Sequence, residues 1–323
     1  MTSKNLFQVG SITKTFTAKL VTDAIHRKQL SLNETVGEIL PQYKKWKKIT
    51  IAQLLNQTSG IADYTESKNW WERLAKNPNK EWSLEELLAI AQKNPDNFRP
   101  GHGWAYSNSN YVLLGLILEK VTGQKLQLLF SALIDQYDLE QTYFLTHRYP
   151  KSIMNGMVQG YYENKENMTS INGSWLQSAG ALVSTPENIV KWIKINLETN
   201  SLLHNNSNWS TTKDGDTPKN MTKTAYSAGF FRMNTPYGIV FFTPGLTPGY
   251  TSMMFYAPCL NAYFAYSVNK APPQGLHKFM IQNLMKVFKE DKVYQQELQQ
   301  YHLIPDYCQN VRPSKYFTFP KIG

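Results

Sequence analysis

Several features that would narrow the class of this protein are scarce in its sequence. Two cysteines, Cys259 and Cys308, occur among 323 residues, which excludes a disulfide-rich scaffold; the two either pair in an oxidising compartment or stay as small buried hydrophobes. The six histidines show neither the H-E-x-x-H motif nor a Cys/His spacing typical of a metal site. We therefore predict no metal ion and no cofactor.

Long apolar runs are also missing. No stretch of about 18 consecutive apolar residues occurs, so we expect no transmembrane segment. Residues 1–10 lack a positively charged start followed by a long apolar core, and no signal peptide is visible in this chain.

The composition that is present indicates a folded protein. Hydrophobic residues make up 41% of the chain, which is enough to bury a large core, and the length suits about two domains. The formal charge is +10, but the basic residues are scattered apart from a cluster at 44–48. No nucleic-acid-binding signature accompanies them. We interpret the cluster as a solvated face and expect no nucleic-acid partner.

The spacing of apolar residues predicts an α+β fold with a helical insertion. Helices are expected where Ser, Thr or Pro precedes an amphipathic or apolar run, and strands where aromatic and β-branched runs lie between Gly and Pro. The expected helices cover 11–29, 49–56, 83–93, 109–121, 185–198 and 275–300. The expected antiparallel strands cover 238–242, 251–257 and 262–268, after an exposed polar loop over 199–224.

A serine and a lysine three residues apart open the first expected helix. Residues that are three apart share one face of a helix, so the Lys14 amine can lie beside the Ser11 hydroxyl. A serine needs a neighbouring base before it attacks a carbonyl, and a desolvated lysine can serve as that base. The same spacing recurs at 210–213 and 267–270, so it is weak by itself. Only Ser11 begins an amphipathic helix, where a plain N-cap role remains the alternative.

A second motif is Tyr106-Ser107-Asn108. A tyrosine near the nucleophile can relay a proton, and the Asn108 amide can hold a substrate amide. The same spacing recurs at 162–164, and Asn108 can instead cap the helix that follows it.

Five segments, in this order, carry a resemblance to a known family. They are FQVGSITKTFTA (7–18), ITIAQLLNQTSGIADY (49–64), PGHGWAYSNSNYVLLG (100–115), GALVSTPEN (180–188) and TPGYTS (247–252). Together they resemble the class C β-lactamase and D-alanyl-D-alanine carboxypeptidase-like serine hydrolases. The resemblance implies an antiparallel sheet flanked by helices, built from 1–30 and 170–323, with an inserted helical domain over 31–169.

The resemblance also implies a mechanism and a set of site residues. Ser11 would attack a carbonyl to form an acyl-enzyme, while Lys14 and Tyr106 move the proton. The backbone N–H groups of Ser11 and Leu246 would hold the oxyanion, a role worth about 2.7–4 kcal/mol per donor in comparable enzymes. The remaining substrate-binding positions by motif alignment are Asn108, Thr243 and Gly245.

By resemblance, the substrate is a D-alanyl peptide of peptidoglycan, a β-lactam or a small ester, and the location is the periplasm or cell envelope. The alternative is a non-catalytic penicillin-binding-like homologue that binds peptidoglycan or a protein partner. Intact Ser11, Lys14 and Tyr106 favour the hydrolase.

The chain departs from the family pattern in two places. Where relatives carry Lys or His, then Thr or Gly, then Gly, this chain has Thr243-Pro244-Gly245 and so lacks the cation. Only ten residues precede Ser11, whereas the family places a helix and two strands there. We therefore expect the N-terminal strands to be missing and the sheet to hold about three strands from 226–269. An unpaired flank of that sheet predicts poor stability, self-association, or both.

Overall fold

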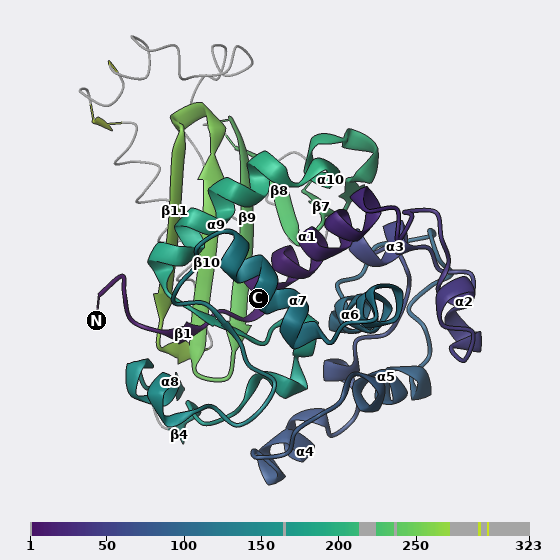
Figure 1. Cartoon of the computed structure of the whole chain (residues 1–323), viewed down its shortest axis with the longest axis horizontal. Helices are drawn as coiled ribbons and strands as arrows, with labels where there is room; N and C mark the ends of the chain where they lie inside the picture. Colours follow the sequence, from purple (N-terminus) through teal and green to yellow (C-terminus); the bar gives the residue numbers. More distant parts are fainter. Residues whose placement is uncertain are drawn as a thin grey trace.

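The protein is built around one six-stranded antiparallel sheet. The computed structural model describes residues 2–163, 166–212, 224–235 and 238–271, together with 290, 291 and 296. The strand order across the sheet is β11-β10-β9-β8-β7-β6 (Figure 1). Its strands are β6 (Ser210–Thr211), β7 (Ala225–Ser227), β8 (Phe230–Thr235), β9 (Gly238–Thr247), β10 (Tyr250–Ala257) and β11 (Ala262–Val268).

The predicted α+β class is confirmed, but the expectation of about three strands was wrong. The three predicted strands lie within β9, β10 and β11, and β8, β7 and β6 extend the same sheet. Cross-strand aromatic contacts explain part of the extension, because Phe231 of β8 stacks on Phe242 of β9 with ring centroids 5.3 Å apart. Two small sheets complete the strands: β1 (Phe7–Gln8), β5 (Leu182–Ser184) and β2 (Tyr143–Phe144) form one, and β12 (Lys270–Ala271), β3 (Tyr161–Tyr162) and β4 (Glu166–Asn167) the other.

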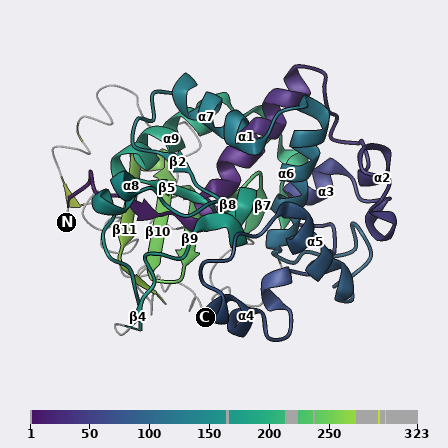
Figure 2. The same ribbon diagram turned by 60° about the horizontal axis from the view of Figure 1, so that its bottom comes forward.

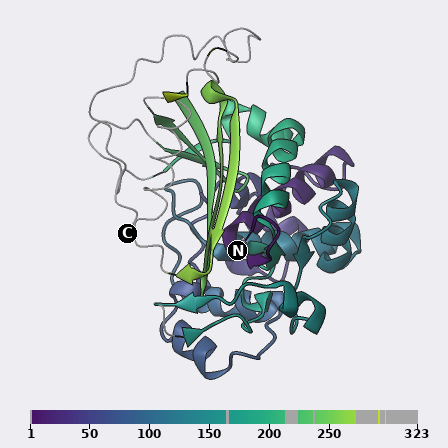
Figure 3. The ribbon, with the colours of Figure 1, turned by 90° about the vertical axis from the view of Figure 1, so that its left-hand side faces the viewer.

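Helices lie against one face of the large sheet (Figure 3). Helix α9 packs on β10 and β11, and α1 packs on α6 and α7. The helices are α1 (Thr13–His26), α2 (Val36–Ile39), α3 (Ile51–Leu55), α4 (Trp70–Lys76), α5 (Leu84–Lys93), α6 (Asn108–Thr122), α7 (Leu126–Gln136), α8 (Lys151–Gly156), α9 (Pro186–Thr199) and α10 (Ser201–His204). Short 3-10 turns are η1 (Gly10–Ile12), η2 (Lys44–Trp46), η3 (Tyr64–Glu66), η4 (Gly173–Trp175), η5 (Gln177–Ala179), η6 (Asn206–Asn208) and η7 (Pro258–Leu260).

Local sequence signals set the starts of α3, α5 and α9. Thr50 before α3 and Ser83 before α5 each form a capping box with the Gln or Glu three residues on. Thr185 caps α9, with Pro186 in its first turn. The first helix differs from its prediction, because α1 begins at Thr13 and Ser11 lies in η1 without capping it.

Two further predictions concern the loop over 199–224 and the helix over 275–300. The segment 199–224 was predicted to be an exposed loop, yet α10, η6 and β6 occupy its first part, because Leu202, Leu203 and Trp209 are buried there. The helix expected over 275–300 falls almost wholly outside the described residues, as does Cys308. Within the described ranges, every helix is too short or too polar to cross a membrane.

Candidate active site

The predicted nucleophile lies in a turn pressed against the sheet. Ser11 follows Gly10, whose φ of +51° is in the left-handed region. A Cβ on Gly10 would lie 2.7 Å from the Leu246 nitrogen and 2.8 Å from its oxygen, so the η1 turn approaches β9 as closely as only glycine permits. Figure 2 shows α1 running from this turn between the sheet and α6.

The Lys14 amine is buried against Ser11. Its side chain belongs to the first turn of α1 and the residue is 1% exposed. Nζ lies 3.0 Å from Ser11 Oγ, 2.7 Å from Asn108 Oδ1 and 2.8 Å from the Ala179 carbonyl oxygen. The rings of Tyr106 and Tyr111 flank the same amine, with centroids 4.9 Å and 5.7 Å away.

Burial brings the pKa of Lys14 close to neutral pH. Removal from water lowers the pKa of Lys14 from 10.5 to about 7, against the opposing pull of the Asp63 carboxylate. A neutral amine has two N–H donors and one lone pair. With Asn108 Oδ1 and the Ala179 carbonyl accepting the two N–H groups, the lone pair is left for the Ser11 hydroxyl.

Tyr106 approaches Ser11 from the other side. Its phenol donates a hydrogen bond to Ser11 Oγ at 2.7 Å. Burial, with Tyr226 adding to it, raises the pKa of Tyr106 well above its ordinary value, although the Ser11 hydrogen bond opposes the change. The phenol therefore keeps its proton at neutral pH and serves as a donor. Among the described side chains that hydrogen-bond to Ser11, Lys14 is the one whose pKa lies near neutral pH.

Asn108 is held at both ends of its amide. Oδ1 accepts from Lys14, and Nδ2 donates to Asp63 Oδ2 at 2.9 Å. The sequence motif predicted a substrate-binding role for Asn108, but the geometry uses its polar atoms within the protein. Sequence reasoning missed Asp63, although it is the penultimate residue of the second family-like segment; a carboxylate three residues after the T-S-G turn was the available signal.

Strand β9 presents its backbone to the Ser11 turn. A two-residue turn joins β9 to β10, and Thr247 pairs with Tyr250 beside it. The pair next to such a turn exchanges backbone hydrogen bonds, and the polar groups of the next residue point the opposite way. The N–H and C=O of Leu246 therefore point away from β10. So does the backbone of Pro244, which explains why a proline without an N–H is tolerated there.

Within the described chain, no strand pairs with that side of the last part of β9. The pairing of β8 with β9 ends at Phe242, so β8 does not cover the segment from Thr243 onward. A Cβ on Gly245 would lie 2.0 Å from the Val9 carbonyl oxygen, so this glycine permits the close approach of the nucleophile's turn. The Leu246 side chain is 50% exposed, which puts an apolar surface beside the predicted oxyanion donor.

Thr243 points into the fold. It is 2% exposed, and its hydroxyl donates to the Gly229 carbonyl oxygen at 2.9 Å. This geometry gives no support to a substrate contact by its side chain. Arg232, the nearest candidate for a replacement cation along the chain, donates to Asn206 Oδ1 at 2.8 Å and stacks over Trp209.

The Ser267–Lys270 pair lacks these surroundings. Ser267 lies in β11 and shares a hydrogen bond of 2.8 Å with Ser252 in β10. Lys213, the partner of Ser210, falls outside the described residues. Across the parts of the chain that the structure describes, no group of three or more His, Cys, Asp or Glu side chains is arranged to hold a metal ion.

The sheet, the helices on one face and the serine turn between them define the fold class of the penicillin-binding proteins and β-lactamases. The family model described as Beta-lactamase matches residues 1–287. The chain belongs to this family, which confirms the resemblance predicted from its motifs.

Two curated relatives cover the chain in part. Protein flp of Staphylococcus aureus (strain MRSA252) is 28% identical over 186 residues, which are 56% of this chain and 33% of flp. A Beta-lactamase of Providencia stuartii is 29% identical over 206 residues, which are 61% of this chain and 48% of that protein. The chain thus spans between a third and a half of these relatives' length.

Solved structures match a larger share. A D-stereospecific amidohydrolase from Streptomyces sp. superposes with a TM-score of 0.75 at 25% identity, covering 83% of each chain. The D-amino acid amidase from Ochrobactrum anthropi SV3 gives a TM-score of 0.72 at 24% identity, covering 89% of this chain and 94% of the amidase. At 24% identity, the likeness to the amidase shows that the two proteins share a fold.

Proposed function

We propose that this protein is a serine hydrolase that forms an acyl-enzyme on Ser11. The observation that carries the proposal is the set of contacts around Lys14. Its amine lies 3.0 Å from Ser11 Oγ, while two carbonyl oxygens, from Asn108 and Ala179, occupy the directions of its N–H groups. A structural N-cap serine would need no such partner, and Ser11 caps nothing.

The proposed reaction begins with proton transfer from the Ser11 hydroxyl to neutral Lys14. Ser11 Oγ attacks the substrate carbonyl, and the N–H groups of Ser11 and Leu246 hold the oxyanion. When the intermediate collapses, the Tyr106 phenol gives its proton to the leaving amine or alkoxide, and the ammonium of Lys14 returns a proton to Tyr106. Water then adds to the ester carbonyl, its proton passes to the same groups, and Ser11 recovers its hydrogen.

The proposed substrate is a D-alanyl peptide, a β-lactam or a small ester. The names of two similar structures, an amidohydrolase and an amidase, support an acyl substrate of this kind. Because Thr243 replaces a cation and its hydroxyl is bound to Gly229, we place neutral esters and amides ahead of anionic β-lactams. Loss of one charge-assisted contact corresponds to about 1–2 kcal/mol, or roughly tenfold in selectivity. A periplasmic or cell-envelope location belongs to the same proposal.

The test is covalent labelling followed by intact-mass measurement. A fluorophosphonate should add one label to the wild type, and Ser11→Ala should lose it. Ser267→Ala, at the serine of the other Ser–Lys pair whose two members the structure both describes, should label normally. Acylation by a p-nitrophenyl ester should exceed that by nitrocefin.

An unlabelled wild type, or a label that persists in Ser11→Ala, would contradict the proposal. The first result would favour the alternative, a non-catalytic homologue that binds peptidoglycan or a protein partner. A wild type that prefers nitrocefin would leave the nucleophile in place and contradict only the substrate order.

A further inference from the structure

A buried carboxylate lies behind the proposed catalytic centre. Asp63 is 5% exposed, just before η3. Its Oδ2 accepts from the backbone N–H of Asn108 at 3.0 Å and from Asn108 Nδ2 at 2.9 Å. Its Oδ1 accepts from the Thr65 N–H at 2.9 Å. Both oxygens are thus held by donors from two separate elements, η3 and the start of α6.

This clamp decides which way the Asn108 amide points. An ionised carboxylate only accepts hydrogen bonds, so the amide must turn its nitrogen toward Asp63. The amide oxygen then faces the opposite way, and it lies 2.7 Å from Lys14 Nζ. With that oxygen and the Ala179 carbonyl taking its N–H groups, the amine directs its lone pair at Ser11.

We propose, on the basis of the function proposed above, that Asp63 is a positioning residue of the catalytic centre. By holding the backbone and side-chain amides of Asn108, it aims the Lys14 amine at the Ser11 hydroxyl. It touches neither Ser11 nor the reacting carbonyl. Asp63 acts through Asn108, and its negative charge acts on Lys14 directly.

The charge of Asp63 also sets the protonation of Lys14. Burial lowers the pKa of Lys14 to about 7, and the Asp63 carboxylate keeps it from falling further. Within the described residues, the other titratable groups that face Lys14 are the phenols of Tyr106 and Tyr111. Glu66 of η3 lies close enough to Asp63 for the two charges to interact. Burial raises the pKa of Glu66, and the Asp63 carboxylate raises it further.

The experiment is a titration of Lys14 in wild type and Asp63→Asn. Lysine labelled with 13C at Cε reports the midpoint by NMR, and the signal of Lys14 is identified by its absence from Lys14→Arg. Removing the charge should lower the midpoint by about one pH unit. The acid limb of the pH profile for acylation by a p-nitrophenyl ester should move down with it. A midpoint that is the same in both proteins would overturn the inference, since a merely structural role would not move it.

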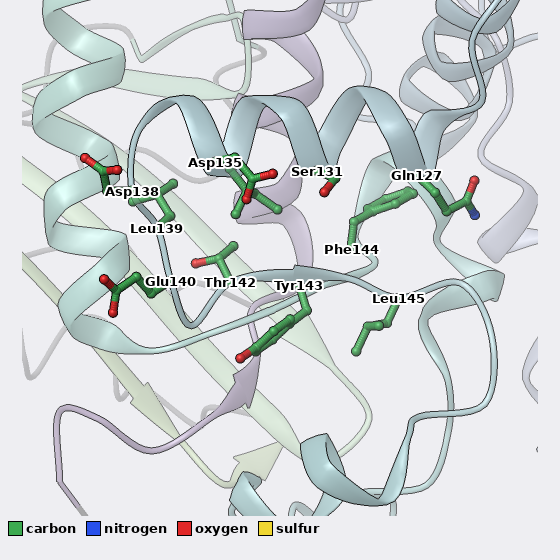
Figure 4. A pocket seen from close by; sticks show the side chains of 11 residues that line it. Gln127, Ser131, Asp135, Asp138, Leu139, Glu140, Thr142, Tyr143, Phe144 and Leu145 are labelled. Carbon is green, nitrogen blue, oxygen red and sulfur yellow. The ribbon is translucent and has the colours of Figure 1, made fainter.

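A charge control comes from a separate hollow of about 520 Å³ between α7 and β2, where Asp135 lines the wall (Figure 4). This hollow shares no lining residue with the proposed centre. Asp135→Asn removes the same charge and should leave both readouts unchanged. An equal shift in this control would mean that the effect is nonspecific.

A second variant separates the positioning effect of Asp63 from the effect of its charge. It also keeps the inference testable if Asp63→Asn fails to fold. Asn108→Ala keeps the carboxylate but removes the oriented carbonyl, and acylation should fall about ten- to a hundredfold. Unchanged acylation in a folded Asn108→Ala would overturn the positioning role. Failure of the proposed function would instead appear as an unlabelled wild type, whereas failure of this inference alone leaves a labelled wild type with an unmoved Lys14 midpoint.

Discussion

At the scale of single residues, the burial of Lys14 has a consequence for stability. The unfolded chain holds the Lys14 proton up to about pH 10.4, whereas the folded chain releases it above about pH 7. Between these values the unfolded state binds one more proton, so raising the pH favours the folded state. Below about pH 7 both states are protonated and the effect is constant.

We therefore expect the unfolding free energy of wild type to rise relative to Lys14→Met as the pH goes from about 7 to about 10. The full shift corresponds to on the order of 4 kcal/mol. Urea unfolding at several pH values measures the difference, and Lys76→Met, at an exposed position of α4, corrects for loss of a surface charge. A flat difference would mean that folded Lys14 is charged at neutral pH, and it would count against a lysine base.

At the scale of elements, the contact between η1 and β9 positions the nucleophile. Gly10 and Gly123 both have left-handed φ, +51° and +69°. A Cβ on Gly123 would meet nothing within 4 Å, whereas one on Gly10 would lie 2.7 Å from the Leu246 nitrogen. The two glycines therefore form a matched pair that differs in the space available rather than in the kind of backbone strain.

Gly123→Ala should cost about 1 kcal/mol of stability, from backbone strain alone, and keep acylation. Gly10→Ala should cost more and reduce Ser11 acylation by at least about tenfold, because η1 must move away from β9. Urea midpoints and single-turnover acylation give both quantities. Equal behaviour of the two variants would show that the approach of η1 to Leu246 does not position the nucleophile.

At the scale of the whole molecule, the proposed centre depends on one continuous core. The largest hydrophobic cluster runs from Val9 at the nucleophile's turn, through Val112 and Leu113 of α6, to Met254 in β10. Lys14 comes from α1, whereas Asn108 begins α6 and Tyr106 lies two residues before it. The division into two domains, 1–30 with 170–323 and 31–169, stays a prediction. Whether or not it holds, α1 and the start of α6 must both be in place for Lys14 to contact Asn108.

We expect loss of Ser11 labelling and loss of near-ultraviolet circular dichroism to coincide in a urea titration, because both follow melting of the shared core. Labelling that disappears at clearly lower urea, with the circular dichroism intact, would show that α1 and α6 separate before the core melts. The expectation of poor stability and self-association rested partly on a three-stranded sheet. That premise was wrong, and self-association itself stays a prediction.

Much of the candidate site could be predicted because its residues lie in short local motifs. Ser11 and Lys14 are three residues apart on one helical face, and Tyr106 stands beside a strongly apolar helix. Asp63 could not be assigned a role in this way. Its function depends on Asn108, 45 residues further along the chain, and a sequence does not show which distant amide a carboxylate meets.

The same limit applies to the sheet. Aromatic and β-branched residues make runs such as 251–257 recognisable as strands. By contrast, β6 and β7 are short strands that join the sheet through the pairing of β7 with β8. Thr243 was predicted to face the substrate by motif alignment, whereas strand parity turns its side chain into the fold. Register is a long-range property, and a shift of one residue exchanges the two faces.

The sequence by itself determined the α+β class, through apolar periodicity, and the family, through its short motifs. It also predicted the Ser11, Lys14 and Tyr106 set, because short motifs encode local geometry. Only the tertiary structure decided that Lys14 is buried and flanked by two aromatic rings, that Asp63 orients Asn108, and that the backbone of Leu246 faces the nucleophile's turn. These three features arise where segments far apart in the chain exclude water together, and no local pattern specifies that exclusion.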